Sequence, residues 1–250
     1  MKIAIYGIAG TMGKVLYNVT QSLSDVDVIF GIDRKAEQKD FDLPVFSTIT
    51  EAEAHASEID CLIDFSYKDN IYDYLPFAAK HEIPCVIATT GFSEEDIAFI
   101  KSFSDKIAIL QSGNMSLGIN LLLKLVRVAT AALKGKADIE IIEQQHAKKL
   151  DAPSGTALLL AQGAISVNND LSIEVGRSGM EKRDPLKIGI SSVRGGTVVG
   201  KHEVIFLMDN ECITLKHEAE NKSIFANGSI NAARFLLDKK QGFYSMEDIF

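Results

Sequence analysis

The densest group of chemically capable side chains lies in residues 143–157, which run EQQHAKKLDAPSGTA. Pro153 presets the backbone for the start of a helix, and Ser154 can cap that helix. The N–H groups of the next two residues would then remain to bind an anion such as a carboxylate. Lys149 precedes the cap and could bind a second carboxylate or deliver a proton. We therefore expect a site for a small dianion, although a solvated loop would also explain Lys149 and a plain helix cap would explain Ser154.

Metal chemistry is not indicated by this sequence. Glu143 and His146 have the i, i+3 spacing of half a di-iron site, but no second Glu-x-x-His pair occurs. The three cysteines are scattered and lack C-x-x-C spacing, so neither a disulfide framework nor a thiolate metal site is predicted. Two histidines are expected to be solvated on surface helices and two to be structural on strands, namely His55 and His81, and His202 and His217.

A second candidate site is the glycine turn GIAGTMG at residues 7–13, which lies between an apolar run and a helical segment. A glycine has no Cβ to hold a pyrophosphate away from the backbone N–H groups, and the start of a helix favours negative charge. Asp33 ends the next apolar run, where a carboxylate can accept both ribose hydroxyls of an adenosine. Arg34 could instead pair with a 2′-phosphate, so the sequence permits both NADH and NADPH. An ordinary tight turn and a solvated strand end are the alternatives.

Two further polar segments each follow an apolar run. Both are small and contain glycine, and they would lie at the sheet edge where a nicotinamide binds. Turn formation alone would also account for them. Their residues are Ala88, Thr89, Thr90 and Gly91, and Gln111, Ser112, Gly113, Asn114 and Met115.

The elements that must position these groups fall into two patterns. Apolar runs alternate with helical segments in the first part, which predicts an α/β fold with a Rossmann-like, doubly wound parallel sheet; the runs are 2–6, 26–32, 61–65, 85–88 and 107–110. A long helix over 117–133 then precedes a second α+β domain with an open mixed sheet. The strands of this sheet are expected from 138 onward and at 188–193, 200–208 and 211–217, and a helix is expected at 157–165. The helix over 225–237 and the tail are expected to return to the first domain. The predicted domains are therefore 1–116 with 223–250, and 117–222.

Composition narrows the classes of partner. The 250 residues are 46% hydrophobic and 24% charged, which is typical of a globular chain rather than a disordered one. The formal charge of −8 would repel a phosphate backbone, so nucleic acid is not expected as a partner. The longest charge-free run, 152–169, contains proline and several polar residues, so no membrane span is predicted. We expect a cytoplasmic protein.

Taken with these motifs, the chain resembles the 4-hydroxy-tetrahydrodipicolinate reductase (dihydrodipicolinate reductase) family over nearly its whole length. The resemblance rests on GIAGTMG at 7–13, Asp33-Arg34, ATTGF at 88–92, SGNMSLGIN at 112–120, IEIIEQQHAKKLDAPSGTA at 139–157, VRGGTVVGKHE at 193–203 and FANG at 225–228. It implies reduction of a dihydropyridine dicarboxylate or its hydroxylated precursor with NADH or NADPH, in diaminopimelate and lysine synthesis. It also implies a homotetramer assembled through the second domain, and no metal.

The resemblance also implies roles for individual residues. Substrate contacts are implied at His146, Gly155 and Thr156, and a proton-donating role at Lys149. Cofactor contacts are implied at Gly7, Ile8, Ala9, Gly10, Thr11, Met12, Asp33, Arg34, Ala88, Thr89, Thr90, Ser112, Gly113, Asn114 and Met115.

One departure from the family pattern concerns the catalytic segment. The family usually has two consecutive histidines, the first assigned as proton donor or acceptor, and Gln145 occupies that first position here. An amide can orient a group by hydrogen bonds but cannot serve as a general acid. Lys201 and Thr197 also stand where acidic residues are common, which affects the loop facing the neighbouring subunit.

Two alternative functions remain at this point. Another two-domain NAD(P) dehydrogenase, for example one acting on a sugar, would need a catalytic lysine near residues 85–91, and none is there. A catalytically impaired, dinucleotide-sensing protein of the same fold is made conceivable by Gln145.

Overall fold

The computed structural model describes residues 1–35 and 40–250, and these divide into two compact units. The first unit comprises Met1–Ser116 and Lys222–Phe250, and the second comprises Leu117–Asn221. Each is described by itself.

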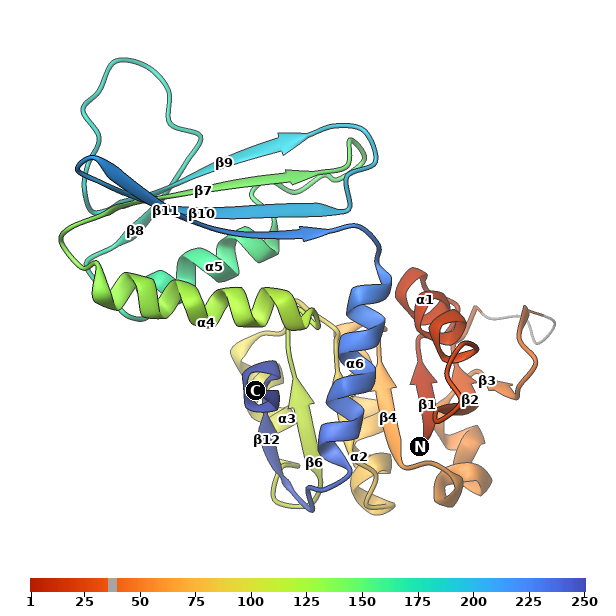
Figure 1. Cartoon of the computed structure of the whole chain (residues 1–250). Coiled ribbons are helices and arrows are strands. Elements are labelled where there is room, and N and C mark those ends of the chain that lie inside the picture. Colours follow the sequence, from red (N-terminus) through yellow and green to blue (C-terminus); the bar gives the residue numbers. More distant parts are fainter. Residues whose placement is uncertain (36–39) are drawn as a thin grey trace. The chain divides into compact units, whose positions relative to one another are not determined.

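The first unit is built on a parallel sheet of seven strands in the order β12-β6-β5-β4-β1-β2-β3 (Figure 1). Its strands are β1 Lys2–Tyr6, β2 Asp27–Ile32, β3 Val45–Phe46, β4 Cys61–Asp64, β5 Cys85–Ile87, β6 Ala108–Gln111 and β12 Gly242–Tyr244. Every strand pair is parallel, which confirms the predicted Rossmann-like fold. The very short strands β3 and β12 were not predicted, because two or three residues carry no readable periodicity.

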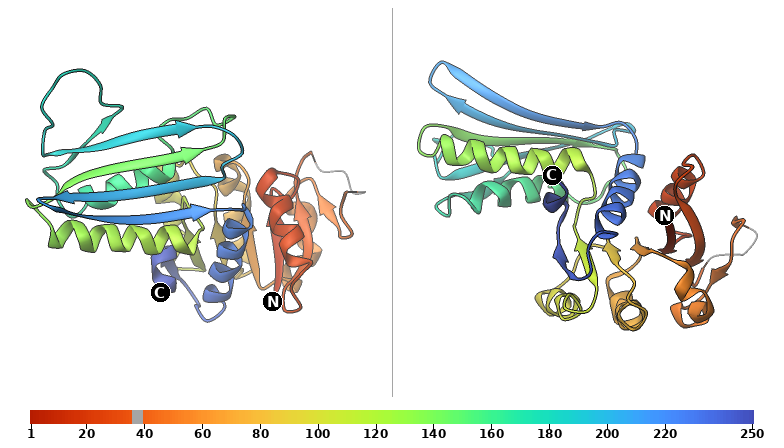
Figure 2. Two further views of the ribbon diagram at one scale, coloured as in Figure 1. Left: turned by 45° about the horizontal axis from the view of Figure 1, so that its top comes forward. Right: turned by 60° about the horizontal axis from the view of Figure 1, so that its bottom comes forward.

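Helices cover both faces of this sheet (Figures 1 and 2). They are α1 Thr11–Thr20, α2 Ile71–Lys80, α3 Glu94–Lys101 and α6 Ser223–Leu236, with 3₁₀ segments η2 Ile49–Glu58, η3 Lys68–Asn70 and η4 Met246–Ile249. Strand side chains such as Tyr6, Leu62 and Ile87 form one core with η2, α2 and α3. Because central parallel strands are buried on both faces, their sequences are continuous apolar runs rather than alternating ones.

The second unit contains a mixed sheet of five strands in the order β11-β10-β7-β9-β8. Its elements are α4 Leu117–Ala132, β7 Asp138–Gln145, α5 Gly155–Ile165, β8 Ser172–Val175, β9 Lys187–Arg194, β10 Gly200–Met208 and β11 Glu211–Ala219. Strand β9 is parallel to β7 and β8, whereas β10 is antiparallel to β7 and β11. The predicted turn between the last two strands is present, with Asn210 at a positive φ of 63°.

The two faces of the five-stranded sheet differ. Both helices of the unit, α4 and α5, pack on one face (Figure 2), where Ile141, Ile190 and Phe206 are buried. The other face carries the exposed apolar side chains Val193 and Leu207. It also carries two ion pairs between neighbouring strands, Lys201–Glu218 and Lys216–Glu203. In the described residues no helix is both long enough and apolar enough to cross a bilayer.

Candidate functional site

The glycine turn after β1 is held tightly against its neighbours. Gly7 has a φ of +83°, and a Cβ on it would lie 2.7 Å from the carbonyl oxygen of Phe65. A Cβ on Gly13 would lie 2.1 Å from the Gly7 oxygen, so the start of α1 can approach the turn only without a side chain there. Gly10 precedes α1, and no side chain of the described residues caps the helix at this position. The backbone N–H groups at the start of α1 are therefore suited to an anion.

Asp33 lies directly beside this turn. Its Oδ2 accepts the Ala9 N–H at 3.1 Å, and its Oδ1 accepts the Lys35 N–H at 2.9 Å. Each carboxylate oxygen has two lone pairs, so each can accept one further hydrogen bond from a ligand hydroxyl. Arg34 extends to Asp73, with 3.6 Å between Nη2 and Oδ2.

Asp64 was given no role from the sequence, yet it organises the neighbouring strand end. This fully buried carboxylate accepts the Ser66 N–H at 2.9 Å and the Tyr74 hydroxyl at 3.1 Å. Burial raises the pKa of Asp64, and the hydrogen bonds from Ser66 and Thr89 oppose that rise. Thr89 Oγ1 also accepts the Ser66 N–H at 3.1 Å, which joins the loops after β4 and β5. The sequence does carry a signal for Asp64, because this aspartate ends a strand that is otherwise apolar.

The segment after β6 is compact. Ser112 Oγ donates to the Asn114 carbonyl at 2.9 Å, and Asn114 Oδ1 accepts the Ser116 N–H at 2.9 Å. A Cβ on Gly228 would lie 1.7 Å from the Met115 carbonyl oxygen, so α6 packs directly on this segment. The sheet thus brings the expected nucleotide residues to the carboxyl ends of β1, β2, β5 and β6, which share one edge.

In the second unit, the centre of the 143–157 segment is a buried ion pair. Glu143 is fully buried, and its Oε1 accepts Arg194 Nη2 at 2.7 Å and the Ser154 N–H at 3.2 Å. Burial alone would raise the pKa of Glu143, but the Arg194 guanidinium, together with hydrogen bonding from Ser192 and Ser154, holds that pKa below its usual value. The same Nη2 donates to the Asp151 carbonyl at 2.6 Å. Arg194 therefore ties the loop before α5 to the sheet.

Ser154 caps α5 as the sequence predicts. Its Oγ accepts the Ala157 N–H at 3.2 Å and lies 3.1 Å from His202 Nε2. Burial lowers the pKa of His202 to about 4, so the ring is neutral near pH 7 and can accept the Ser154 hydroxyl proton. Gly155 and Thr156 form the first turn of α5, next to this cap.

Lys149 is held by Asp151, with 2.8 Å between Nζ and Oδ1. Strand β7 ends at Gln145, and His146 begins the loop that carries Lys149. Gln145 lies two residues beyond Glu143 and so on the same, covered face of the sheet. The Gln145 carbonyl accepts the Gly195 N–H at 3.0 Å. The structure thus gathers the segment around the ends of β7 and β9.

Sequence reasoning also missed Arg194, although a signal existed. In β9, Ile188 and Ile190 alternate onto the covered face, and the same alternation places Arg194 on that face. In β7, Ile141 and Glu143 lie on the covered face for the same reason. Opposite charges on the covered faces of two strands are the pattern of a buried pair. His202, expected to be structural, is buried within this polar cluster.

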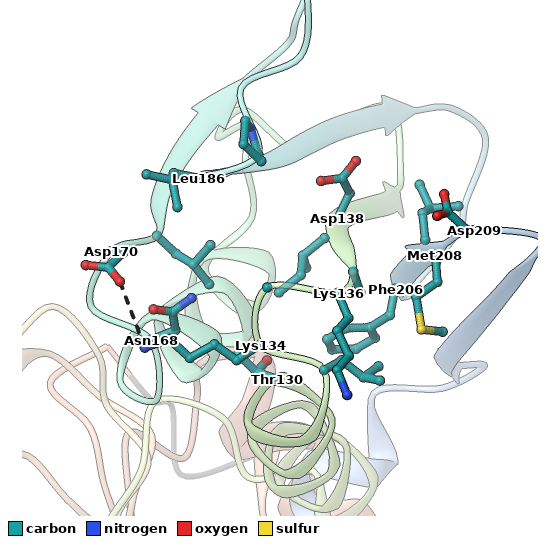
Figure 3. A pocket seen from close by; sticks show the side chains of 17 residues that line it. Thr130, Lys134, Lys136, Asp138, Asn168, Asp170, Leu186, Phe206, Met208 and Asp209 are labelled. Atoms are coloured by element: carbon teal, nitrogen blue, oxygen red, sulfur yellow. Dashed lines mark ion pairs between the residues drawn. The ribbon is translucent and has the colours of Figure 1, made fainter.

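A cavity of about 610 Å³ lies at the other end of the second sheet (Figure 3). It is lined by the start of β7 and the end of β10, including Asp138 and Phe206, and the ion pair of Lys134 with Asp170 spans 3.9 Å beside it. The eight residues of β7, roughly 25 Å, separate its two ends, and no sequence-predicted site residue lines the cavity. In the described part of the chain, no group of three or more His, Cys, Asp and Glu side chains could hold a metal ion.

Known proteins match both parts of the chain sequence. Profiles of "Dihydrodipicolinate reductase, N-terminus" and "Dihydrodipicolinate reductase, C-terminus" match residues 1–115 and 118–250. The 4-hydroxy-tetrahydrodipicolinate reductase of Caldanaerobacter subterraneus subsp. tengcongensis is 44% identical over 251 residues, covering 100% of this chain and 98% of the relative. That of Alkaliphilus oremlandii is 40% identical over 253 residues, with the same coverage of 100% and 98%.

Among solved structures, a dipicolinate-bound dihydrodipicolinate reductase from Paenisporosarcina sp. TG-14 superposes with a TM-score of 0.83, covering 100% of this chain and 99% of that one. At 23% identity this likeness concerns the fold. The family is identified by the two matching profiles and by the relatives that match over nearly their full length. The chain belongs to the dihydrodipicolinate reductase family.

Proposed function

We propose that this protein reduces 4-hydroxy-tetrahydrodipicolinate to tetrahydrodipicolinate with NADH or NADPH, a step of the diaminopimelate route to lysine. The observation that carries the proposal is the full-length match to reductases of that name. The substrate is a small dicarboxylate, and no metal takes part.

The first unit fits a nicotinamide dinucleotide. The glycine turn and the start of α1 suit the pyrophosphate, because backbone N–H groups at a helix start bind anions. The turn depends on its glycines, since a Cβ on Gly7 or Gly13 would collide with neighbouring backbone atoms. Asp33 can accept the ribose hydroxyls, and Arg34 can reach a 2′-phosphate. The segments at 88–90 and 112–115 follow β5 and β6 on the nicotinamide side. When bound, the nucleotide supplies the hydride; the protein binds and orients it.

The second unit supplies the groups for a dianion. The first turn of α5, at Gly155 and Thr156, offers backbone N–H groups and a helix dipole to one carboxylate. Lys149 neutralises the other and delivers the proton, and His146 contacts the substrate. Arg194 and Ser154 keep these groups in place through Glu143.

Proton delivery rests on Lys149 rather than on Gln145, because an amide has no titratable proton in the useful range. An ammonium that binds a carboxylate and donates a proton acts in both the ground state and the transition state. Lys149→Met should therefore lower kcat and raise KM together. Gln145→Ala should cost at most about 10²-fold in kcat, the lower end of general-acid effects.

Steady-state oxidation of NADH with enzymatically generated substrate tests this, with Gln145→His as the matched variant that restores a titratable group. Near-parent kcat for Lys149→Met together with a loss of several orders of magnitude for Gln145→Ala would show that the proton takes another route, through water held by Gln145. Nucleotide binding without any turnover by the parent would favour the dinucleotide-sensing alternative.

We also propose that the chain is a cytoplasmic homotetramer. The face of the second sheet opposite α4 and α5 supports assembly, because Val193 and Leu207 are about half exposed there among paired charges. Light scattering should give four times the chain mass, and Leu207→Asp should reduce it. A monomeric parent would contradict the assembly.

A further inference from the structure

The expected ribose end of the nucleotide site is flanked by two loops of the first unit. Strand β1 lies between β2 and β4, so the segments after those strands lie on either side of the glycine turn. Arg34 follows β2, and Asp73 lies in the first turn of α2, which follows β4. Their side chains meet at 3.6 Å between Nη2 and Oδ2. Both are mostly solvent-exposed, at 72% and 52%, so charge rather than packing holds them together.

Charges of both signs lie at this end. Asp33 and Asp73 supply two carboxylates, and Arg34 and Lys35 supply two cations. Tyr6, the last residue of β1, lies within reach of both aspartates and of Arg34: burial raises the pKa of Tyr6 to about 12, and Asp73 raises that pKa by more than Arg34 lowers it. At the end of β1, Asp73 therefore has a larger electrostatic effect than Arg34.

NADH and NADPH differ at this position. NADPH carries a 2′-phosphate with a charge of about −1.5 to −2 near pH 7, whereas NADH presents a hydroxyl that a carboxylate can accept. The guanidinium that would pair with the phosphate is already paired with Asp73. We infer that Asp73 is a specificity-determining residue that favours NADH over NADPH, by holding Arg34 and by repelling the 2′-phosphate. The inference rests on the proposed function.

The expected effect is modest, because the pair is exposed. Asp73→Asn should lower the Kd for NADPH relative to that for NADH by roughly two- to fivefold, the range of an exposed ion pair. The change should shrink at high ionic strength, since salt screens exposed charges. It should also shrink in the Arg34→Ala background, where the guanidinium is gone.

Fluorescence titration of the full chain with NADH and with NADPH, at low and high ionic strength, tests the inference. Asp69→Asn is the matched control, because Asp69 lies in η3 four residues earlier and its change removes the same charge. Asp73→Glu retains the charge and should keep the parent ratio of the two Kd values. Among these aspartate variants, we expect the ratio to change only in Asp73→Asn.

An unchanged ratio in Asp73→Asn, or an equal change in Asp69→Asn, would overturn the inference while both nucleotides still bind, leaving the proposed function intact. A parent that binds neither nucleotide would overturn both.

Discussion

Replacing Arg194 by Met should strongly destabilise the second unit. Glu143 is fully buried; the change removes the Arg194 bond to its Oε1 and leaves the bond from the Ser154 N–H. Removing one partner of a buried ion pair costs about 3–5 kcal/mol, because an uncompensated charge is left behind. At about 2–4 °C per kcal/mol, the thermal midpoint should fall by roughly 10 °C.

The charge argument is separated from lost packing by a double-mutant cycle with Glu143→Gln. Calorimetry and urea unfolding of the parent, both single variants and Arg194→Met/Glu143→Gln would give the coupling free energy, expected at about 1–3 kcal/mol. The double variant should be more stable than the sum of the single effects predicts. Additive effects would refute the reasoning, since they would mean that the two side chains act independently.

The pH dependence gives a further check on the same pair. Because the folded-state pKa of Glu143 is lowered, its stabilisation is complete above the unfolded-state pKa of about 4.3 and is lost as the pH falls through the lower, folded-state value. The difference in stability between parent and Arg194→Met should therefore narrow below about pH 4.

Two other changes test burial and close approach. His202 has a folded-state pKa of about 4 against its ordinary 6.5, so the unfolded state binds more protons between these two pH values. In urea unfolding, the parent should therefore lose about 3 kcal/mol of unfolding free energy between pH 6.5 and pH 4. The His202→Gln variant should lack this loss. Equal acid losses in both proteins would contradict this. Gly13→Ala should cost about 1–3 kcal/mol by overpacking, because its Cβ would lie 2.1 Å from the Gly7 oxygen. Gly113→Ala is the control, as a Cβ there meets nothing within 4 Å, and equal losses would refute the packing argument.

The parallel sheet of the first unit was predictable because its central strands are apolar runs between helical segments. Strand β8, Ser172–Val175, was not, because four residues, of which three are half-buried and one is exposed, resemble the neighbouring loop. The cap at Ser154 was predictable since it depends on residues within one turn.

The polar network could not be predicted because it depends on strand order. Glu143 meets Arg194 only because β9 lies beside β7 in parallel register, with Gln145 opposite Arg194. Strand β8 and helix α5 intervene in the sequence, and periodicity does not say which strands become neighbours. Asp64 likewise finds Tyr74 through the packing of α2 on β4.

The route of the chain through the two units has a consequence for synthesis on the ribosome. The second unit is one continuous stretch, whereas the first needs α6 against Met115 and β12 beside β6, where Gly242 pairs with Ala108. Until residues 222–250 have been made, the β6 edge lacks its partner strand, and an unpaired edge invites association with other chains. The unit begun first is thus completed last, after the second has had time to fold. Nascent first units would therefore be the aggregation-prone species in the cell.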